Sequence, residues 1–281
     1  MTVVIDGKKL AQDIRVEIKA GVDKFRSERK RDIGLAVVLV GDNPASQVYV
    51  RNKIKACEEV GIKSYSEYLP ADCAQDSLAS VVKRLATDKN IDGILVQLPL
   101  PEHLDAEKIL KLIPTEKDVD GFSEENTGKL SRGEDCLVAC TPNGIMKILE
   151  RYGVETCGKK AVVVGRSDIV GKPMAMLLIN ADATVTVCHS KTADLKEECL
   201  RADILVAAVG KTKFITADMV KEGATVIDVG MNRNENGKLC GDVDFENVKD
   251  KCSYITPVPG GVGPMTITML MYNTLQAALR R

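Results

Sequence analysis

The chain alternates between two hydrophobic patterns. Short runs rich in β-branched residues are typical of strands buried on both faces of a parallel sheet, and stretches with an apolar residue every three or four positions are typical of amphipathic helices. The runs predict strands at residues 35–40, 62–69, 94–96, 161–164, 184–187, 203–209 and 225–229, with another near Tyr254. The periodic stretches predict helices at residues 10–25 (capped by Asp6), 46–60, 77–88, 106–113, 144–152, 173–178 and 265–279, with a short one near Phe245. Asn236-Gly237 predicts a hairpin with a two-residue turn. Strands that alternate with helices favour an α/β fold.

Interruptions of this alternation predict how the chain divides. The polar, irregular residues 123–135 are interpreted as a connection, and the boundary between domains is expected near the helix at 144–152. A length of 281 residues is enough for two modest α/β domains. The last helix is too apolar to be a free tail, and we expect it to pack back on the first domain. We therefore predict a first domain of residues 1–139 plus 262–281 and a second domain of residues 140–261.

The unit at residues 160–192 predicts a dinucleotide site. A strand, a loop bounded by Gly165 and Gly171, a helix and a second strand follow one another, which is the usual cradle for a pyrophosphate at a helix N-terminus. The fingerprint of such sites is G-x-G-x-x-G, but here the outer glycines lie one residue further apart and Ser167 replaces the middle one. Glycines between a strand and a helix can also mark a tight turn alone. The prediction therefore depends on the flanking strand and helix.

The residues around the second strand of this unit favour NADP over NAD. An NAD site tends to place an acid at the end of that strand for the ribose 2′-hydroxyl, whereas an NADP site uses cations. No acid follows the strand until Asp194, and Asp182 precedes it, at the wrong end. Arg166, Ser190 and Lys191 could surround a 2′-phosphate, although a merely exposed polar loop would have the same composition.

Polar side chains are expected to gather at the carboxyl edge of the first sheet, where ligands of open α/β sheets bind. Tyr49 and Lys53 lie four residues apart on one helix face, Gln97 follows a strand, and Asp118 and Asp120 follow the next helix. A lysine, an amide and a carboxylate at one edge suit acid–base chemistry on a nitrogenous substrate. Each also has a plainer interpretation: lysines are usually solvated, tyrosines usually pack, and amides and acids often hold turns.

The composition narrows the class of protein. A net charge of −1, the absence of tryptophan and an aromatic content of 4% argue against partners such as nucleic acid or an anionic membrane. The N-terminal sequence does not predict a signal peptide, and no apolar run approaches the roughly 18 residues that span a bilayer. Nine scattered cysteines without a C-x-x-C pair, with only two histidines, argue against a metal site and favour reduced thiols in a cytoplasmic protein.

Motifs along nearly the whole chain resemble those of the bacterial bifunctional methylenetetrahydrofolate dehydrogenase/methenyltetrahydrofolate cyclohydrolases, in that family's order. The motifs are YVRNK (49–53), VQLPL (96–100), EKDVDG (116–121), CTP (140–142), VGRS (164–167), IVG (169–171), CHSKT (188–192) and PVPGGVGPMT (257–266). The resemblance implies two α/β domains facing a cleft, the second Rossmann-like, in a homodimer. It also implies NADP-dependent oxidation of 5,10-methylenetetrahydrofolate and hydrolysis of the product to 10-formyltetrahydrofolate, within one-carbon metabolism and purine biosynthesis.

The same resemblance assigns roles to residues. Lys53 carries over as the central cyclohydrolase residue, assisted by Tyr49 and Gln97, and Asp120 as the residue that holds the pterin ring. The substrate-binding residues carried over are Tyr49, Lys53, Gln97, Leu98, Asp120, Pro259, Gly260 and Gly261. The cofactor-binding residues carried over are Gly165, Arg166, Ser167, Ile169, Gly171 and Ser190.

Other functions compete with this one. An NADP dehydrogenase of the amino-acid or shikimate type pairs similar domains and also uses a lysine. A nucleotide-sensing regulator would keep the fold without the chemistry, but the complete set of Tyr49, Lys53 and Gln97 argues against it. A dehydrogenase that lacks cyclohydrolase activity is disfavoured by the presence of Lys53.

Overall fold

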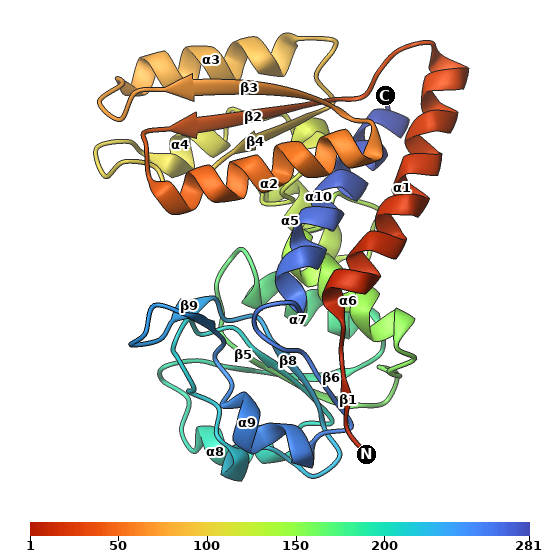
Figure 1. Cartoon of the computed structure of the whole chain (residues 1–281), viewed down its shortest axis with the longest axis vertical. Coiled ribbons are helices and arrows are strands. Elements are labelled where there is room, and N and C mark those ends of the chain that lie inside the picture. Colours follow the sequence, from red (N-terminus) through yellow and green to blue (C-terminus); the bar gives the residue numbers. More distant parts are fainter. The chain divides into compact units, whose positions relative to one another are not determined.

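The computed structural model describes all 281 residues, which form two compact units, each with its own parallel sheet (Figure 1). The three-stranded unit, named after its sheet, comprises Gln12–Lys129, Glu134–Cys140 and Ile267–Arg281. The six-stranded unit comprises Met1–Ala11, Leu130–Gly133 and Thr141–Thr266.

The sheet of the three-stranded unit has the order β3-β2-β4, with every pair parallel. The strands are β2 (Gly34–Val40), β3 (Lys63–Leu69) and β4 (Gly93–Val96). Every residue of the central strand β2 is buried, which explains its continuous apolar sequence, whereas the edge strand β3 alternates between exposed and partly buried positions. Helices α2 (Pro44–Val60) and α3 (Gln75–Thr87) cover opposite faces of this sheet (Figure 1).

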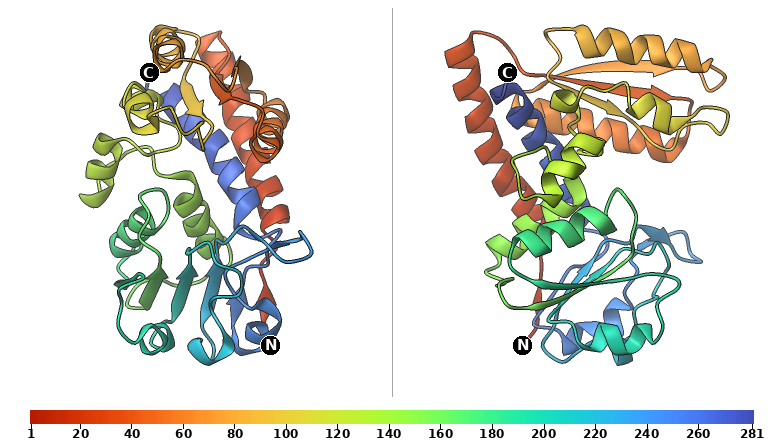
Figure 2. Two further views of the ribbon diagram at one scale, coloured as in Figure 1. Left: turned by 90° about the vertical axis from the view of Figure 1, so that its left-hand side faces the viewer. Right: turned by 180° about the vertical axis from the view of Figure 1, so that it is seen from behind.

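Two long helices, α1 (Gly7–Arg29) and α10 (Val262–Leu279), belong to this unit over most of their length. They run side by side in every view (Figure 2). A Cβ at Gly21 of α1 would lie 2.7 Å from Leu275 Cδ2 of α10, so the missing side chain allows the helices to pack closely. The shorter elements are α4 (Ala106–Leu110), the 3₁₀ helix η1 (Thr115–Lys117) and α5 (Glu124–Ser131). None of the helices combines the length and the apolar character that crossing a membrane requires.

The sheet of the six-stranded unit has the order β1-β11-β8-β7-β5-β6, and every pair is parallel. Its strands are β1 (Val3–Val4), β5 (Lys160–Val164), β6 (Thr184–Cys188), β7 (Ile204–Ala207), β8 (Thr225–Asp228) and β11 (Tyr254–Ile255). The order reverses between β5 and β7. This reversal is the topological switch point at which doubly wound sheets bind their ligands.

Helices and a hairpin surround this sheet. The helices are α6 (Cys140–Arg151), α7 (Gly171–Asn180), α8 (Leu195–Leu200), α9 (Phe245–Val248) and the 3₁₀ helices η2 (Ala217–Met219) and η3 (Lys249–Lys251). The hairpin consists of β9 (Asn232–Arg233) and β10 (Leu239–Cys240), which are antiparallel.

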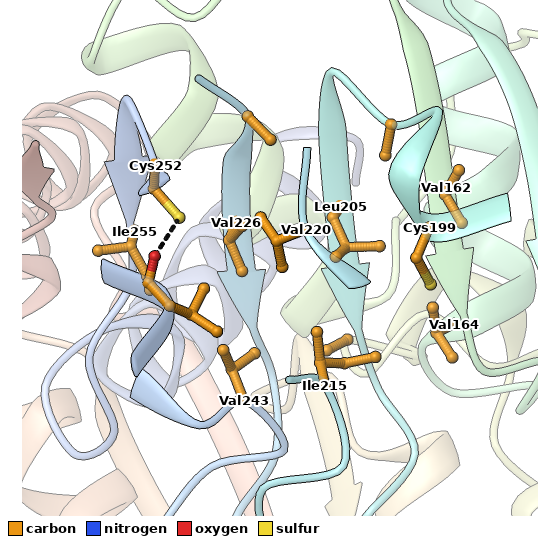
Figure 3. Packing of buried hydrophobic residues seen from close by; sticks show 14 of the residues in the cluster. Val162, Val164, Cys199, Leu205, Ile215, Val220, Val226, Val243, Cys252 and Ile255 are labelled. Carbon is orange, nitrogen blue, oxygen red and sulfur yellow. Dashed lines mark hydrogen bonds between the residues drawn. The ribbon is translucent and has the colours of Figure 1, made fainter. Parts of the chain in front are cut away.

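A buried cluster fills one face of the six-stranded sheet (Figure 3). Val162, Leu205, Val226 and Ile255 come from four neighbouring strands and lie in a row in this cluster. Cys252 takes part as an apolar filler whose thiol donates a hydrogen bond to the Val248 carbonyl oxygen at 3.4 Å. Burial raises the pKa of this thiol to about 12, so it stays protonated.

The predicted α/β class and the alternation of elements are confirmed, but two local predictions were wrong. Residues 123–135 are not merely a connection, because they contain the polar helix α5. Ser123 caps the start of this helix, since its Oγ accepts a hydrogen bond from Asn126 N–H at 3.2 Å. The Asn236-Gly237 turn does lie in a hairpin, but its loop is longer than two residues, since Asn234 N–H donates to Lys238 O at 2.9 Å.

The division of the chain differs from the predicted one at the N-terminus. Residues 1–11 were expected in the first domain, but β1 pairs with β11 and Met1–Ala11 group with the six-stranded unit. Two exposed valines carry no periodic pattern, so the pairing could not be foreseen from local sequence. Residues 130–133 and 262–266 were also expected in the first domain but group with the six-stranded unit, whereas Ile267–Arg281 group with the three-stranded unit.

Candidate functional site

The carboxyl edge of the three-stranded sheet brings Lys53 and Gln97 into direct contact. Lys53 Nζ donates a hydrogen bond to Gln97 Oε1 at 3.0 Å, and Gln97 Nε2 donates to Leu98 O at 2.6 Å. The amide is therefore fixed at both ends, with its oxygen toward the ammonium group. Gln97 is only 8% exposed and Lys53 is half-buried, so this lysine is not a solvated surface charge.

Local sequence explains how both side chains reach this edge. Asn43 Oδ1 accepts hydrogen bonds from Ala45 N–H at 3.0 Å and Ser46 N–H at 3.2 Å, so it caps α2 directly after β2. Pro44 occupies the first helical turn, where its missing N–H costs nothing. Gln97 follows β4 and continues the sheet by donating its N–H to Val38 O at 2.9 Å.

Tyr49 and Leu98 border the Lys53–Gln97 pair. Tyr49 lies one helical turn before Lys53 on α2, with its residue surface 37% exposed. Leu98 is half-buried and supplies the carbonyl that fixes Gln97. An exposed ring beside an oriented ammonium group can stack on a flat ligand.

Asp120 lies near enough to Lys53 for the two charges to interact. Burial raises the pKa of its carboxyl to about 6, the Lys53 charge opposes this rise and the Asp118 charge adds to it. The neighbouring acid Asp118 is engaged in hydrogen bonds within the chain. Asp118 accepts hydrogen bonds from Gly121 N–H, Ser123 N–H and Asn126 Nδ2 at 2.7–3.1 Å, so it is a turn anchor and no candidate for substrate.

The backbone next to Asp120 is fixed by hydrogen bonds from Asn273 and Cys140, two residues that the sequence analysis did not identify as part of the site. Asn273 of α10 donates to Val119 O at 2.9 Å and to Val138 O at 2.7 Å, and Cys140 Sγ donates to Val119 O at 3.3 Å. Burial raises the pKa of the Cys140 thiol well above its ordinary value, with the Asp120 charge adding to the rise. Asn273 carried a sequence signal, because it is a polar residue inside a helix that is otherwise strongly apolar.

The glycine-bounded loop of the six-stranded unit has the close packing that a dinucleotide site requires. Gly165 has φ 134°, and a Cβ there would lie 2.2 Å from Ala208 O. A Cβ at Gly171 would lie 2.2 Å from Gly165 O. The outer glycines therefore keep the tight turn and the close helix–strand contact of the fingerprint.

Ser167, which stands in place of the middle glycine of the fingerprint, binds the N-terminus of α7 through its side chain. Its Oγ accepts hydrogen bonds from Val170 N–H at 3.2 Å and Gly171 N–H at 3.4 Å, which tightens the entry into α7. Arg166 and Ile169 of this loop are exposed. The N-terminus of α7 is thus preceded by a polar, accessible loop suited to a phosphate group.

The end of β6 lies beside this loop, because Gly165 N–H donates to Cys188 O at 2.9 Å. The chain then turns sharply, with His189 N–H bound to Thr192 Oγ1 at 2.8 Å and Thr192 N–H bound to His189 O at 2.9 Å. Ser190 is exposed on this turn. The structure therefore brings the segments of Arg166 and Ser190 together at the end of β6, after which no acid occurs until Asp194, and this arrangement fits a 2′-phosphate.

The third predicted segment, Pro259 to Gly261, lies after β11 in the six-stranded unit. Gly260 has φ 107°, and Gly261 N–H donates to Pro257 O at 2.9 Å. The start of α1 packs on this loop so tightly that a Cβ at Gly7 would lie 1.9 Å from Gly261 O. The glycines thus give an accessible loop a fixed backbone.

Comparisons with known proteins show the family of the chain. Residues 5–120 match the family model "Tetrahydrofolate dehydrogenase/cyclohydrolase, catalytic domain", and residues 139–281 match the "NAD(P)-binding domain" model of the same name. The bifunctional protein FolD of Moorella thermoacetica is 58% identical over 277 residues, 99% of each chain.

Solved structures give the same result. The bifunctional FolD enzyme of Campylobacter jejuni superposes with a TM-score of 0.97 at 50% identity, covering 100% of both chains. The Trypanosoma brucei enzyme, solved with NADP and an inhibitor, has a TM-score of 0.95 at 42% identity and covers 99% of this chain and 98% of that one. A shikimate dehydrogenase of Thermus thermophilus has a TM-score of 0.54 at 18% identity and covers 88% of this chain and 99% of its own, so it shares the fold alone.

Proposed function

This chain belongs to the tetrahydrofolate dehydrogenase/cyclohydrolase family, and from that membership we propose which of its residues carry out the two reactions. The enzyme oxidises 5,10-methylenetetrahydrofolate to 5,10-methenyltetrahydrofolate with NADP and hydrolyses the product to 10-formyltetrahydrofolate. The shikimate-type alternative is too distant to compete.

We place NADP at the carboxyl edge of the six-stranded sheet, across the loop from Gly165 to Gly171. The close approach of both glycines to backbone oxygens supports this placement, because a dinucleotide needs the same lack of side chains. Arg166 and Ser190 bind the 2′-phosphate in this proposal, while Ser167 and Ile169 line the loop. Bound NADP supplies the acceptor for the hydride of the first reaction.

The dehydrogenase step requires little acid–base catalysis from the protein. The methenyl product is a delocalised cation, so its charge is spread over the bridge between two nitrogens. The residues of the chain mainly hold the substrate in the orientation that hydride transfer requires. In our proposal Asp120 binds the N–H groups of the pterin ring, Tyr49 and Leu98 border it, and Pro259, Gly260 and Gly261 form a loop against the substrate.

The cyclohydrolase step needs a group that handles protons. Water adds to the methenyl carbon and loses one proton to solvent. The hydroxyl proton of this adduct then moves to N5 as the bond from the carbon to N5 breaks, which leaves the formyl group on N10 and an N–H on N5. We propose that the Lys53 ammonium stabilises the oxygen of this adduct and relays the proton, giving one proton to N5 and taking one from the hydroxyl. Gln97 positions the ammonium, and Tyr49 completes the site.

The observation that carries the proposal is the 3.0 Å hydrogen bond from Lys53 Nζ to Gln97 Oε1 at the sheet edge. The test is Lys53→Met, which keeps the length of the chain but removes the charge and the protons. Cyclohydrolase turnover, followed by the loss of methenyltetrahydrofolate absorbance, should fall by roughly 10²–10⁴-fold, the usual worth of a general acid–base group. NADP binding should be unchanged.

Lys55→Met is the matched control, because Lys55 is an exposed lysine two residues further along the same helix. It should hydrolyse methenyltetrahydrofolate at the wild-type rate. Unchanged cyclohydrolase turnover in Lys53→Met would remove this lysine from the mechanism.

The setting of the enzyme is also part of the proposal. We propose a cytoplasmic homodimer whose 10-formyltetrahydrofolate serves purine biosynthesis, with folate derivatives as partners and neither nucleic acid nor membrane. The nine free cysteines support a reducing compartment, and the near balance of charge supports a small-molecule partner. Light scattering of the purified protein tests the dimer, and a mass of 30.5 kDa, that of one chain, would contradict it.

A further inference from the structure

A fully buried carboxylate, Asp242, collects four hydrogen bonds beside the carboxyl edge of the six-stranded sheet. Its Oδ2 accepts from Val209 N–H at 2.6 Å and Gly210 N–H at 3.0 Å. Its Oδ1 accepts from Lys211 N–H at 2.9 Å and from Asn232 Nδ2 at 2.8 Å. Three consecutive backbone N–H groups thus converge on one side chain, in the concave arrangement that otherwise binds free anions.

A second buried acid holds Asp242 in place. Asp228 Oδ1 accepts from Asp242 N–H at 2.8 Å and from Gly230 N–H at 2.9 Å, and its Oδ2 accepts from Val243 N–H at 2.9 Å. A Cβ at Gly241 would lie 1.8 Å from Asp228 Oδ2, so only glycine permits this approach. The two acids therefore form one fixed assembly at the end of β8.

The backbone that Asp242 holds adjoins the proposed cofactor loop. Val209 follows Ala208, whose carbonyl oxygen would lie 2.2 Å from a Cβ at Gly165. Gly210 takes a left-handed conformation with φ 69°, so the loop has a defined shape that the carboxylate fixes. In a doubly wound sheet the strands on this side of the switch point, here β7 and β8, serve the half of the dinucleotide that carries the nicotinamide.

We propose that Asp242 is a positioning residue for NADP, which shapes the nicotinamide half of the cofactor site by fixing the loop of Val209 to Lys211 and Asn232. This inference rests on the proposed placement of NADP at the carboxyl edge of the six-stranded sheet. It assigns to Asp242 an effect on the dehydrogenase that the cyclohydrolase does not share, because hydrolysis consumes no NADP.

The test is Asp242→Asn, which keeps the shape but replaces one acceptor oxygen with an NH₂ group that faces two donors. Leaving such donors unsatisfied should raise the KM for NADP by about tenfold or more. The increase in melting temperature that saturating NADP gives the wild type should shrink, which is a readout independent of activity. Cyclohydrolase turnover of added methenyltetrahydrofolate should stay within about twofold of the wild-type rate.

Asp250→Asn is the matched control, since Asp250 is an exposed acid of the same unit. It should leave all three readouts unchanged. If Asp242→Asn does not fold, Asn232→Ala is the milder variant, because it removes one donor and leaves the three backbone N–H groups on the carboxylate. It should raise the KM for NADP by about two- to fivefold.

The outcomes separate this inference from the placement on which it depends. A folded Asp242→Asn enzyme with wild-type NADP affinity overturns the positioning role, as does an equal fall of both activities. The same holds for wild-type NADP affinity in Asn232→Ala. If Arg166→Ala also binds NADP normally, the placement of the cofactor fails; if Arg166→Ala alone loses affinity, the placement stands and only the role of Asp242 fails.

Discussion

The two candidate sites of this enzyme are built from different materials. The site of the three-stranded unit consists of charged and amide side chains, Lys53, Gln97 and Asp120, gathered at the end of a sheet. The site of the six-stranded unit consists mainly of backbone, a loop held in shape by missing side chains at Gly165 and Gly171. Chemistry that moves protons requires side chains, whereas a cofactor that brings its own reactivity requires a shaped surface.

The largest expected effect tests the cofactor site of the six-stranded unit. Gly165→Ala should reduce NADP affinity by more than about 100-fold and destabilise the fold by about 2–4 kcal/mol, because the new Cβ meets a backbone oxygen at 2.2 Å and φ is 134°. Calorimetric NADP titration and thermal unfolding measure the two effects. Gly158→Ala is the control, since its φ of 70° is also left-handed but no atom lies within 4 Å of the added Cβ. Equal losses in both variants would mean that backbone strain, and not the packing of the cofactor loop, is being measured.

The next effect tests the site of the three-stranded unit. Gln97→Ala removes the acceptor that orients the Lys53 ammonium and should lower cyclohydrolase turnover by about 10–100-fold, with little change in NADP affinity. Gln47→Ala, a change of the same kind on the first turns of α2, should leave turnover intact. A Gln97→Ala enzyme that hydrolyses at the wild-type rate would show that the hydrogen bond to Lys53 has no part in the reaction.

An effect of similar size separates charge from shape within the cofactor site. Arg166→Ala should raise the KM for NADP by about 10–100-fold and the KM for NAD much less, because a charged hydrogen bond to the 2′-phosphate is lost. Lys172→Ala is the control, since this exposed lysine is already paired with Asp168 at 2.5 Å. Equal effects of Arg166→Ala on NADP and NAD would refute the assignment.

The smallest effect concerns pH. Burial raises the pKa of Asp120 to about 6, so this carboxylate is ionised above that pH and becomes protonated as the pH falls through it. An ionised carboxylate accepts the N–H groups of a pterin, and a protonated one accepts fewer. The KM for methylenetetrahydrofolate should therefore rise several-fold between about pH 7 and pH 5. In Asp120→Asn the KM should be higher and should lose this pH dependence; a wild-type profile in that variant would exclude Asp120 as the titrating group.

The two sites also differed in how far the sequence predicted them. The strands and helices followed from hydrophobic pattern, and with them the edges on which Lys53, Gln97 and Gly165 lie. Local pattern could not predict β1, which has two residues, or α5, which has no apolar stripe. The residue roles came from resemblance to the family, since helical spacing alone favoured a solvated charge over a catalyst for Lys53.

Long-range contacts explain what the sequence did not predict. Asn273 holds the backbone before Asp120 across more than 150 positions of the chain. Asp242 binds a loop more than 30 positions before it. Asn273 stands out as a polar residue in an apolar helix, but the sequence does not indicate the partners of either residue, because each partner is an ordinary backbone group whose position depends on the completed fold.

The most direct test of the account is a crystal structure of the enzyme with NADP and a folate analogue bound together. The account predicts Lys53 Nζ within about 3.5 Å of the one-carbon position or of the water beside it, with the nicotinamide ring held by the six-stranded unit against the same carbon. A Lys53 ammonium turned into solvent, with the analogue bound elsewhere, would contradict it.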